Sequence, residues 1–274
     1  MSLLTRGTAP EGAAAEMPKS LLVFAHPDDE VIAIGARMGR FGNAHFLHVT
    51  DGAPRDERDS RAHGFATLAE YKDARWAEFR QALARAGIAN APRECLEIPD
   101  QQASLHLAEL ALEVCRRIER IEPEIVFTHP YEGGHPDHDA CAFAVHRALA
   151  LRRAQGYRMP AVLEGTFYHR GARGMVTGVF LRRPERMEEV VYSLSPPERE
   201  RKQALIECFV TQKQVLAQFR LESERFRIAP PYDFGKPPHA GPVLYDEHPW
   251  GITSERFCRL VREALETLQG KGTA

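Results

Sequence analysis

The chain has 274 residues, of which 43% are hydrophobic, and its formal net charge is −2. This length and composition suffice for one full hydrophobic core. Basic residues are interleaved with acidic ones along the chain, which argues against nucleic acid or an anionic membrane as the partner. No segment approaches the roughly 20 apolar residues of a transmembrane helix. We therefore expect one catalytic body that is soluble.

The cysteines and the N-terminus bear on location. The five cysteines lie far apart and include no C-x-x-C pair, which is typical of a reducing cytosol and not of a disulfide framework or a thiolate zinc site. The N-terminus has no apolar stretch of secretory length, so we expect a cytoplasmic protein. Residues 1–18 are rich in small and polar residues, which predicts a flexible tail ahead of a single domain over residues 19–274.

In the first half of the chain, short apolar runs alternate with helical patterns. Such runs are typical of strands buried on both faces. The alternation predicts an α/β fold of Rossmann-like type, with a mostly parallel sheet and helices on both faces. The expected strands are 20–25, 44–50, 93–100 and 124–130, and the expected helices are 31–39, 66–86, 104–121 and 139–153.

The second half predicts a smaller, irregular C-terminal portion. Many prolines and glycines in residues 229–251 indicate a long loop. The other expected elements are strands at 161–169, 178–184 and 189–194 and helices at 197–219 and 254–268.

A charged cluster, HPDDE at residues 26–30, follows the first expected strand. Ligands of an open parallel sheet bind beyond the carboxyl ends of its strands, which is where this cluster falls. A turn that caps a helix needs one carboxylate, so three acidic residues and a histidine exceed what capping requires. The cluster is therefore a candidate site.

A second cluster, HPYEGGHPDHDA at residues 129–140, follows the fourth expected strand and should open at the same edge. His135 and His138 are three residues apart across a Pro-Asp turn, so both rings can face one cleft. Two imidazoles and a carboxylate leave a position for water, as catalytic zinc sites do. Such a site also needs a proton-accepting carboxylate and a donor to the oxyanion, and the two turns hold spare groups of both kinds.

These motifs resemble a known family. AHPDDE at 25–30, TDG at 50–52 and HPDH at 135–138 are similar to the zinc-dependent de-N-acetylases of the PIG-L/LmbE family. That family includes N-acetylglucosaminyl-phosphatidylinositol de-N-acetylases and the deacetylases of mycothiol and bacillithiol synthesis. The resemblance covers residues 20 to about 150.

The resemblance implies a role for each motif residue. The zinc ligands would be His26, Asp29 and His138, and Asp28 would be the general base that takes a proton from the attacking water. His135 would be a protonated imidazole that stabilises the oxyanion. Asp137 would hold a histidine in the right tautomer.

Two substrate-binding residues follow from softer matches. Arg75 and Glu78 resemble the R-x-x-E helix of the family, whose arginine tends to face the sugar, although a solvated ion pair is an alternative for Arg75. Gln212, in the Thr211-Gln212 pair, also resembles a family position, and a half-solvated helix-edge glutamine is the alternative. Tyr131 stands farther from His135 than the tyrosine that some sugar-specific members of the family place just ahead of their histidine, which puts an amino-sugar substrate in doubt.

The expected activity is zinc-dependent hydrolysis of an amide, in which activated water removes an N-acetyl or other N-acyl group from an amino sugar or sugar-containing small molecule. Alternatives within this class are a thiol-conjugate amidase and a deacylase of an acylated antibiotic or lipid. Outside it stand an iron enzyme with two histidines and one carboxylate and a non-catalytic metal-binding protein. The family resemblance also allows a homo-oligomer, with Trp250 and the Pro-rich segment as a candidate subunit contact.

Overall fold

The structure is a computed structural model that describes residues 17–183 and 187–271. A central sheet has the strand order β3-β2-β1-β4-β5-β9-β8. The first five of these strands are parallel, while β9 runs antiparallel to β5 and β8 antiparallel to β9. The expected α/β fold with a mostly parallel sheet is confirmed. The strands are β1 (Ser20–Phe24), β2 (Ala44–Pro54), β3 (Arg93–Asp100), β4 (Ile125–Thr128), β5 (Ala161–Gly165), β8 (Glu189–Ser193) and β9 (Ser223–Ile228), and a separate hairpin joins β6 (Tyr168–Gly171) to β7 (Gly174–Thr177).

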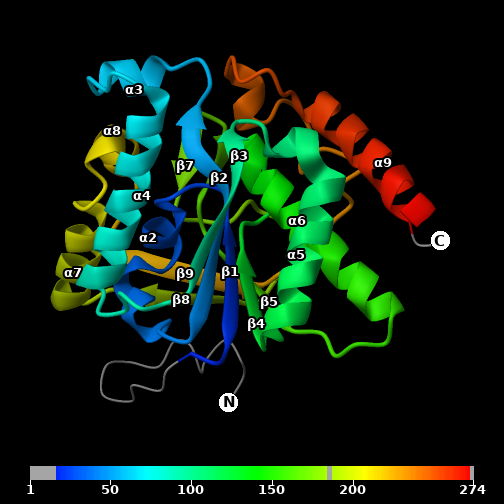
Figure 1. The fold of residues 1–274 in the computed structure, drawn as a ribbon, viewed down its shortest axis with the longest axis horizontal. Coiled ribbons are helices and arrows are strands. Elements are labelled where there is room, and N and C mark those ends of the chain that lie inside the picture. Colours follow the sequence, from blue (N-terminus) through cyan, green and yellow to red (C-terminus); the bar gives the residue numbers. More distant parts are fainter. Residues whose placement is uncertain (1–16, 184–186, 272–274) are drawn as a thin grey trace.

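Helices cover both faces of the sheet (Figure 1). One hydrophobic cluster lies under α5, α6 and α9, and a second lies under α2, α4 and α7. The helices are α2 (Asp29–Ile34), α3 (Arg58–Ala62), α4 (Leu68–Arg85), α5 (Leu107–Ile121), α6 (Pro136–Ala154), α7 (Pro196–Ile206), α8 (Lys213–Leu216) and α9 (Ser254–Lys271), with 3-10 turns η1 (Gly35–Arg40), η2 (Ala103–His106), η3 (Val210–Gln212) and η4 (Leu244–Glu247).

Strand β1 lies at the point where the order of the sheet reverses. Its neighbours are β2 on one side and β4 on the other. The chain leaves β1 through α2 and leaves β4 through α6, and the two helices pack on opposite faces of the sheet. Connections that diverge in this way open a crevice beyond the carboxyl ends of the strands, where open α/β sheets bind ligands.

The second half departs from several expectations. The strand expected at 178–184 does not form in residues 178–183, and residue 184 lies outside the described residues. The strand expected at 161–169 divides into β5 and the start of β6. β5 pairs with β4 and β9, whereas β6 leaves the central sheet and pairs with β7. A local sequence pattern does not reveal this change of partner.

The helix expected over residues 197–219 is also interrupted. α7 ends at Ile206, and the chain turns so that Phe209 is buried before η3 begins. Helical periodicity is the same for one helix or for two that share a buried face, so the pattern alone did not show the break. The sequence pattern does not predict β9, because the strand begins with three polar residues and its apolar residues are Phe226 and Ile228.

Two further expectations concern the N-terminal tail and transmembrane helices. Residues 1–16 of the expected tail lie outside the described residues, whereas Met17 is buried and its N–H donates to the Arg40 carbonyl over 3.0 Å. In residues 17–183 and 187–271, no helix is both long enough and apolar enough to cross a bilayer.

Candidate active site

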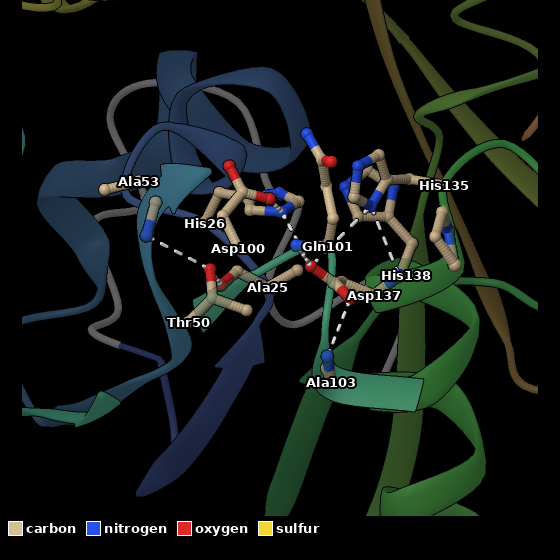
Figure 2. Close-up of polar contacts among 12 residues, drawn as sticks. Ala25, His26, Thr50, Ala53, Asp100, Gln101, Ala103, His135, Asp137 and His138 are labelled. Carbon is tan, nitrogen blue, oxygen red and sulfur yellow. Dashed lines mark hydrogen bonds and ion pairs between the residues drawn. The ribbon is translucent and has the colours of Figure 1, made fainter. Parts of the chain in front are cut away.

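The turns that follow β1 and β4 bring the three ligands implied by the resemblance together. His26 Nδ1 lies 3.5 Å from Asp29 Oδ2, and His138 Nε2 lies 3.2 Å from Asp29 Oδ1. The rings of His26 and His138 are 5.3 Å apart between centroids, and all three side chains are buried. Figure 2 shows the two histidines on either side of the crevice. Ligand atoms of His26, His135 and His138 lie within 4.8 Å of one another, and so do those of Asp29, His129 and His138, so the described residues offer more than one set of donors to an ion.

Asp28 stands at the start of α2 in a strained backbone conformation, with φ of 146°. Its N–H donates to Glu30 Oε2 over 3.3 Å, and its carboxylate accepts from Arg75 over 3.3 Å. Burial, together with the neighbouring carboxylates Asp29 and Glu30, raises the pKa of Asp28 to about 8, although Arg75 opposes this shift. Strain of this kind is often kept at functional sites, where it fixes a reactive group in place.

Arg75, expected to bind substrate or to be solvated, is buried beside Asp28. Besides the Asp28 contact, its guanidinium donates to the carbonyls of Gly52 over 2.6 Å and Pro27 over 3.0 Å. Gly52 has φ of 66°, and a Cβ there would lie 3.0 Å from the guanidinium carbon. The TDG motif therefore leaves room for the arginine, and the arginine holds the Asp28 turn.

His135 is the N-cap residue of α6, and its ring is held on three sides. Its Nδ1 accepts from the N–H of Asp137 over 3.2 Å, so a neutral ring carries its proton on Nε2. Trp250 packs on the ring at 4.4 Å between centroids, and His26 lies edge-on at 4.7 Å. Burial and the neighbouring histidines hold the pKa of His135 well below its usual value. This direction favours a neutral ring that donates a hydrogen bond, whereas the resemblance implies an imidazolium, and the role of His135 stays a prediction.

Asp137 is fully buried and organises the crevice through the backbone. It accepts from the N–H groups of Gln101 over 2.6 Å and Ala103 over 2.9 Å (Figure 2). Its Oδ2 lies 3.4 Å from His26 Nε2 and 3.9 Å from His135 Nδ1. The histidine nearest to this carboxylate is therefore His26.

Asp100 and His129 are two members of the cluster that the sequence reasoning did not assign. Asp100, the last residue of β3, places Oδ1 3.0 Å from His26 Nε2. His129 stacks on His138 at 3.9 Å, and its Nε2 accepts from the N–H of Ala25 over 3.0 Å. That bond occupies the lone pair of Nε2, so His129 ties β4 to the end of β1. Both residues stand where an expected strand ends, which is the signal that could have found them.

The charges and donors of this cluster fit a divalent metal ion. Four buried carboxylates belong to it, namely Asp28, Asp29, Asp100 and Asp137. Burial acts to lower the pKa of His26, but the carboxylates around it raise that pKa well above its usual value, so the cluster attracts positive charge. His138 Nε2 is buried and, apart from the ion-pair contact with Asp29 at 3.2 Å, has no hydrogen-bond partner among the described residues. Imidazole nitrogens and carboxylate oxygens are ligands that zinc takes at catalytic sites.

A cleft of about 450 Å³ opens over the cluster. Gln212 lines it with its side chain half-buried, and its Nε2 donates to the Tyr71 hydroxyl over 2.9 Å. Thr211 instead donates from its hydroxyl to buried Glu78 over 2.6 Å.

The two aromatic residues singled out in the sequence lie in different places. Tyr131 lies in the core, where its hydroxyl donates to the Lys236 carbonyl, and it is not among the residues that line the cleft. Trp250, expected at a subunit contact, lines the cleft.

Comparison with known proteins gives matches in both sequence and fold. 1D-myo-inositol 2-acetamido-2-deoxy-alpha-D-glucopyranoside deacetylase 1 of Catenulispora acidiphila is 29% identical over 179 residues, which cover 57% of this chain and 54% of that protein. The chain thus spans about half the length of this curated relative.

Two solved structures illustrate the similarity of fold. The A40926 pseudoaglycone deacetylase Dbv21 is 18% identical, with a TM-score of 0.57 over 77% of this chain and 96% of that chain. GalB, a 4-carboxy-2-hydroxymuconate hydratase of Pseudomonas putida KT2440, is 20% identical, with a TM-score of 0.50 over 78% of this chain and 98% of that chain. A hydratase and a deacetylase thus share this architecture, so the fold by itself does not define the reaction.

The fold is that of an α/β protein, and its buried His and Asp cluster is a candidate metal site at the switch point of the sheet. Residues 21–149 match the PIG-L family, described as GlcNAc-PI de-N-acetylase. The resemblance expected from the motifs is confirmed. Proteins of this family are metal-dependent amide hydrolases.

Proposed function

We propose that this protein is a zinc-dependent N-deacetylase that releases an acyl group from the nitrogen of a sugar-containing small molecule. One observation carries the proposal: Asp28 and His135 flank the buried set of His26, Asp29 and His138. A site that only stored a metal would need neither a strained carboxylate nor a free imidazole N–H beside the ligands. The printed descriptions of the PIG-L match and the curated relative support the same reaction.

His26, Asp29 and His138 would hold the ion. When bound, zinc acts as a Lewis acid that makes a neighbouring water more acidic and polarises the amide carbonyl. The positive charge of the bound ion would lower the raised pKa of Asp28, so that its carboxylate would accept the proton of the attacking water. Arg75 keeps the Asp28 carboxylate in place through the contact at 3.3 Å.

His135 donates from Nε2 to the carbonyl oxygen as negative charge develops on it. Its neutral state suits a hydrogen-bond donor, and the Asp137 N–H on Nδ1 fixes which nitrogen carries the proton. The proton taken up by Asp28 then passes to the leaving nitrogen, the C–N bond breaks, and acetate and the free amine result. In this proposal Asp137 is a positioning residue, because it bonds to the backbone and to His26.

The direct test measures metal and activity together. Purified protein is examined by elemental mass spectrometry and then assayed for acetate release from N-acetylglucosamine glycosides and from N-acetylglucosaminyl-inositol. We expect about one zinc per chain and release of acetate that stops when a chelator removes the metal and returns when zinc is restored. Metal-loaded protein that releases no acid from any N-acyl sugar, thiol-conjugate amide or acyl antibiotic would overturn the proposal. Activity with added iron, a 2-oxo acid and oxygen would favour the iron-enzyme alternative instead.

A further inference from the structure

Glu30 and His48 are two buried residues near the proposed base to which the mechanism above gives no role. Both side chains are fully buried, and His48 Nε2 lies 3.0 Å from Glu30 Oε2. Glu30 belongs to α2 and directly follows the proposed ligand Asp29, whereas His48 lies on β2. The same oxygen of Glu30 accepts the N–H of Asp28 over 3.3 Å. The pair is therefore connected to the backbone of the proposed base.

The ring of His48 is held by aromatic side chains of α4. It lies edge-on to Phe79 at 4.5 Å and to Trp76 at 5.8 Å between ring centroids. Because protein interiors are close-packed, a ring enclosed in this way keeps one orientation. His48 Nε2 therefore stays directed at the carboxylate of Glu30.

The peptide bond between Pro27 and Asp28 is held at both of its polar groups. Its carbonyl oxygen accepts from Arg75 over 3.0 Å, and its N–H donates to Glu30. A peptide group is planar, so these two bonds fix the orientation of the whole group. Asp28 leaves this plane with φ of 146°, in a region that residues other than glycine avoid. Such a conformation persists only where the surrounding contacts impose it.

Stability alone does not explain the pair. Glu30 Oε1 and His48 Nδ1 are buried and have no hydrogen-bond partner within residues 17–183 and 187–271. A buried polar atom without a partner destabilises the fold, and apolar side chains of similar size would avoid this. A cap for α2 would need the carboxylate but not the histidine. Fixing the turn at Asp28 is the role that the contacts of both residues support.

We infer that Glu30 and His48 are positioning residues for the proposed base. His48 orients the carboxylate of Glu30, and Glu30 holds the peptide group before Asp28 so that the Asp28 carboxylate faces the attacking water. Neither residue lines the cleft, so both act through Asp28. The inference rests on the proposed function and adds two residues to its machinery. The acceptor oxygen of Glu30 is the feature that matters, and its charge is not required.

Two substitutions of Glu30 separate the acceptor oxygen from side-chain shape. Glu30→Gln keeps an oxygen that accepts from the Asp28 N–H, whereas Glu30→Met has a similar shape and no such oxygen. Acetate release from N-acetylglucosaminyl-inositol is measured on zinc-loaded protein. Glu30→Met should lower kcat by about 10 to 10² with KM and zinc content unchanged, because the base is misplaced. Glu30→Gln should keep kcat within about threefold of the wild type.

His48→Leu provides a second variant, which decides the question if Glu30→Met does not fold. It removes the group that orients Glu30 but leaves the acceptor oxygen, so kcat should fall by about fivefold with zinc content unchanged. His48→Gln keeps a polar group that reaches Glu30 and should recover most of this loss. Equal kcat in His48→Leu and the wild type would remove His48 from the inference.

Two comparisons exclude a merely structural effect. Phe46→Leu, at a fully buried residue on the same strand as His48, should lower Tm by a few degrees and leave kcat unchanged. Glu30→Met added to Asp28→Asn should cause no further loss of kcat, because both substitutions act on the same group. A loss in Phe46→Leu equal to that in Glu30→Met, or an additional loss in the double variant, would overturn the inference.

Hydrogen exchange of the Asp28 N–H gives a readout that needs no substrate. Measured by NMR on isotope-labelled protein, this exchange should be about tenfold faster in Glu30→Met than in the wild type or Glu30→Gln. If exchange changes in this way but the wild type never releases acetate, the proposed hydrolysis is wrong and the contact that holds Asp28 stands. In an active enzyme, unchanged kcat or unchanged exchange in folded Glu30→Met protein would overturn the inference.

Discussion

The two sides of the cleft differ in how their residues are held. The catalytic side consists of turns that directly follow the buried strands β1 and β4, and its side chains bond to backbone groups. The C-terminal side consists of a hairpin, a four-residue helix and a Pro-rich segment, and several of its side chains reach into water. Rigid strand ends suit chemistry, whereas irregular segments can vary to suit different substrates.

The largest expected effect is loss of the metal from the catalytic side. His138→Ala removes a proposed ligand, so we expect zinc content and acetate release both to fall to background. Elemental mass spectrometry on purified protein measures the first. His106→Ala is the control, because the side chain of this histidine is 40% exposed and pairs with Glu109 at 3.2 Å. Full zinc in the His138→Ala protein would remove His138 from the ligand set.

Asp28→Asn should separate metal binding from turnover. Asparagine has nearly the same shape but does not accept the proton, so we expect zinc to remain while kcat falls by about 10² to 10⁴. Asp73→Asn on the exposed face of α4 is the matched control, with kcat unchanged. An Asp28→Asn enzyme with unchanged kcat would show that another group is the base.

Trp250 tests whether the C-terminal side also serves the chemistry. Trp250→Ala removes the ring that packs on His135 at 4.4 Å, so we expect kcat to fall by about tenfold while zinc content stays the same. Trp250→Phe keeps an aromatic ring and should recover most of the loss. Trp76→Phe, at the only other tryptophan of the chain, should leave kcat unchanged. A fall in zinc content with Trp250→Ala would make this side part of the metal site itself.

The smallest effect concerns the contact between α6 and the Pro-rich segment, where His146 packs against Tyr232 and Phe234. Burial lowers the pKa of His146 to about 4, against about 6.5 in an unfolded chain. The folded state therefore binds fewer protons between these values, and this contribution to stability is lost as the pH falls from about 6.5 toward 4. His146→Phe should flatten the decrease in Tm between pH 7 and pH 5 by a few degrees, as followed by calorimetry. An identical decrease in the variant would show that His146 does not titrate in this range.

The two sides of the cleft also differ in how well the sequence pattern predicts their secondary structure. β3 forms over the expected residues 93–100, and β1 and β4 match within two residues at each end. β1 and β4 are short, mainly apolar runs that are fully buried, so the pattern and the burial agree, whereas β3 is mostly half-buried. In the second half, the interrupted helix and the unexpected β9 depend on pairing and packing with distant residues, which no local periodicity contains.

For this protein, the sequence by itself determined that two histidine and carboxylate turns follow parallel strands and so meet at one sheet edge. That inference needs only the rule that parallel strands share their carboxyl ends. The tertiary structure decided which groups complete the cluster: Asp100 and His129 join it from two strand ends, and Trp250 reaches His135 from a segment more than 100 residues later. It also decided that Arg75 is buried against Asp28. These contacts join residues far apart in the chain, and their energies arise only when packing removes them from water.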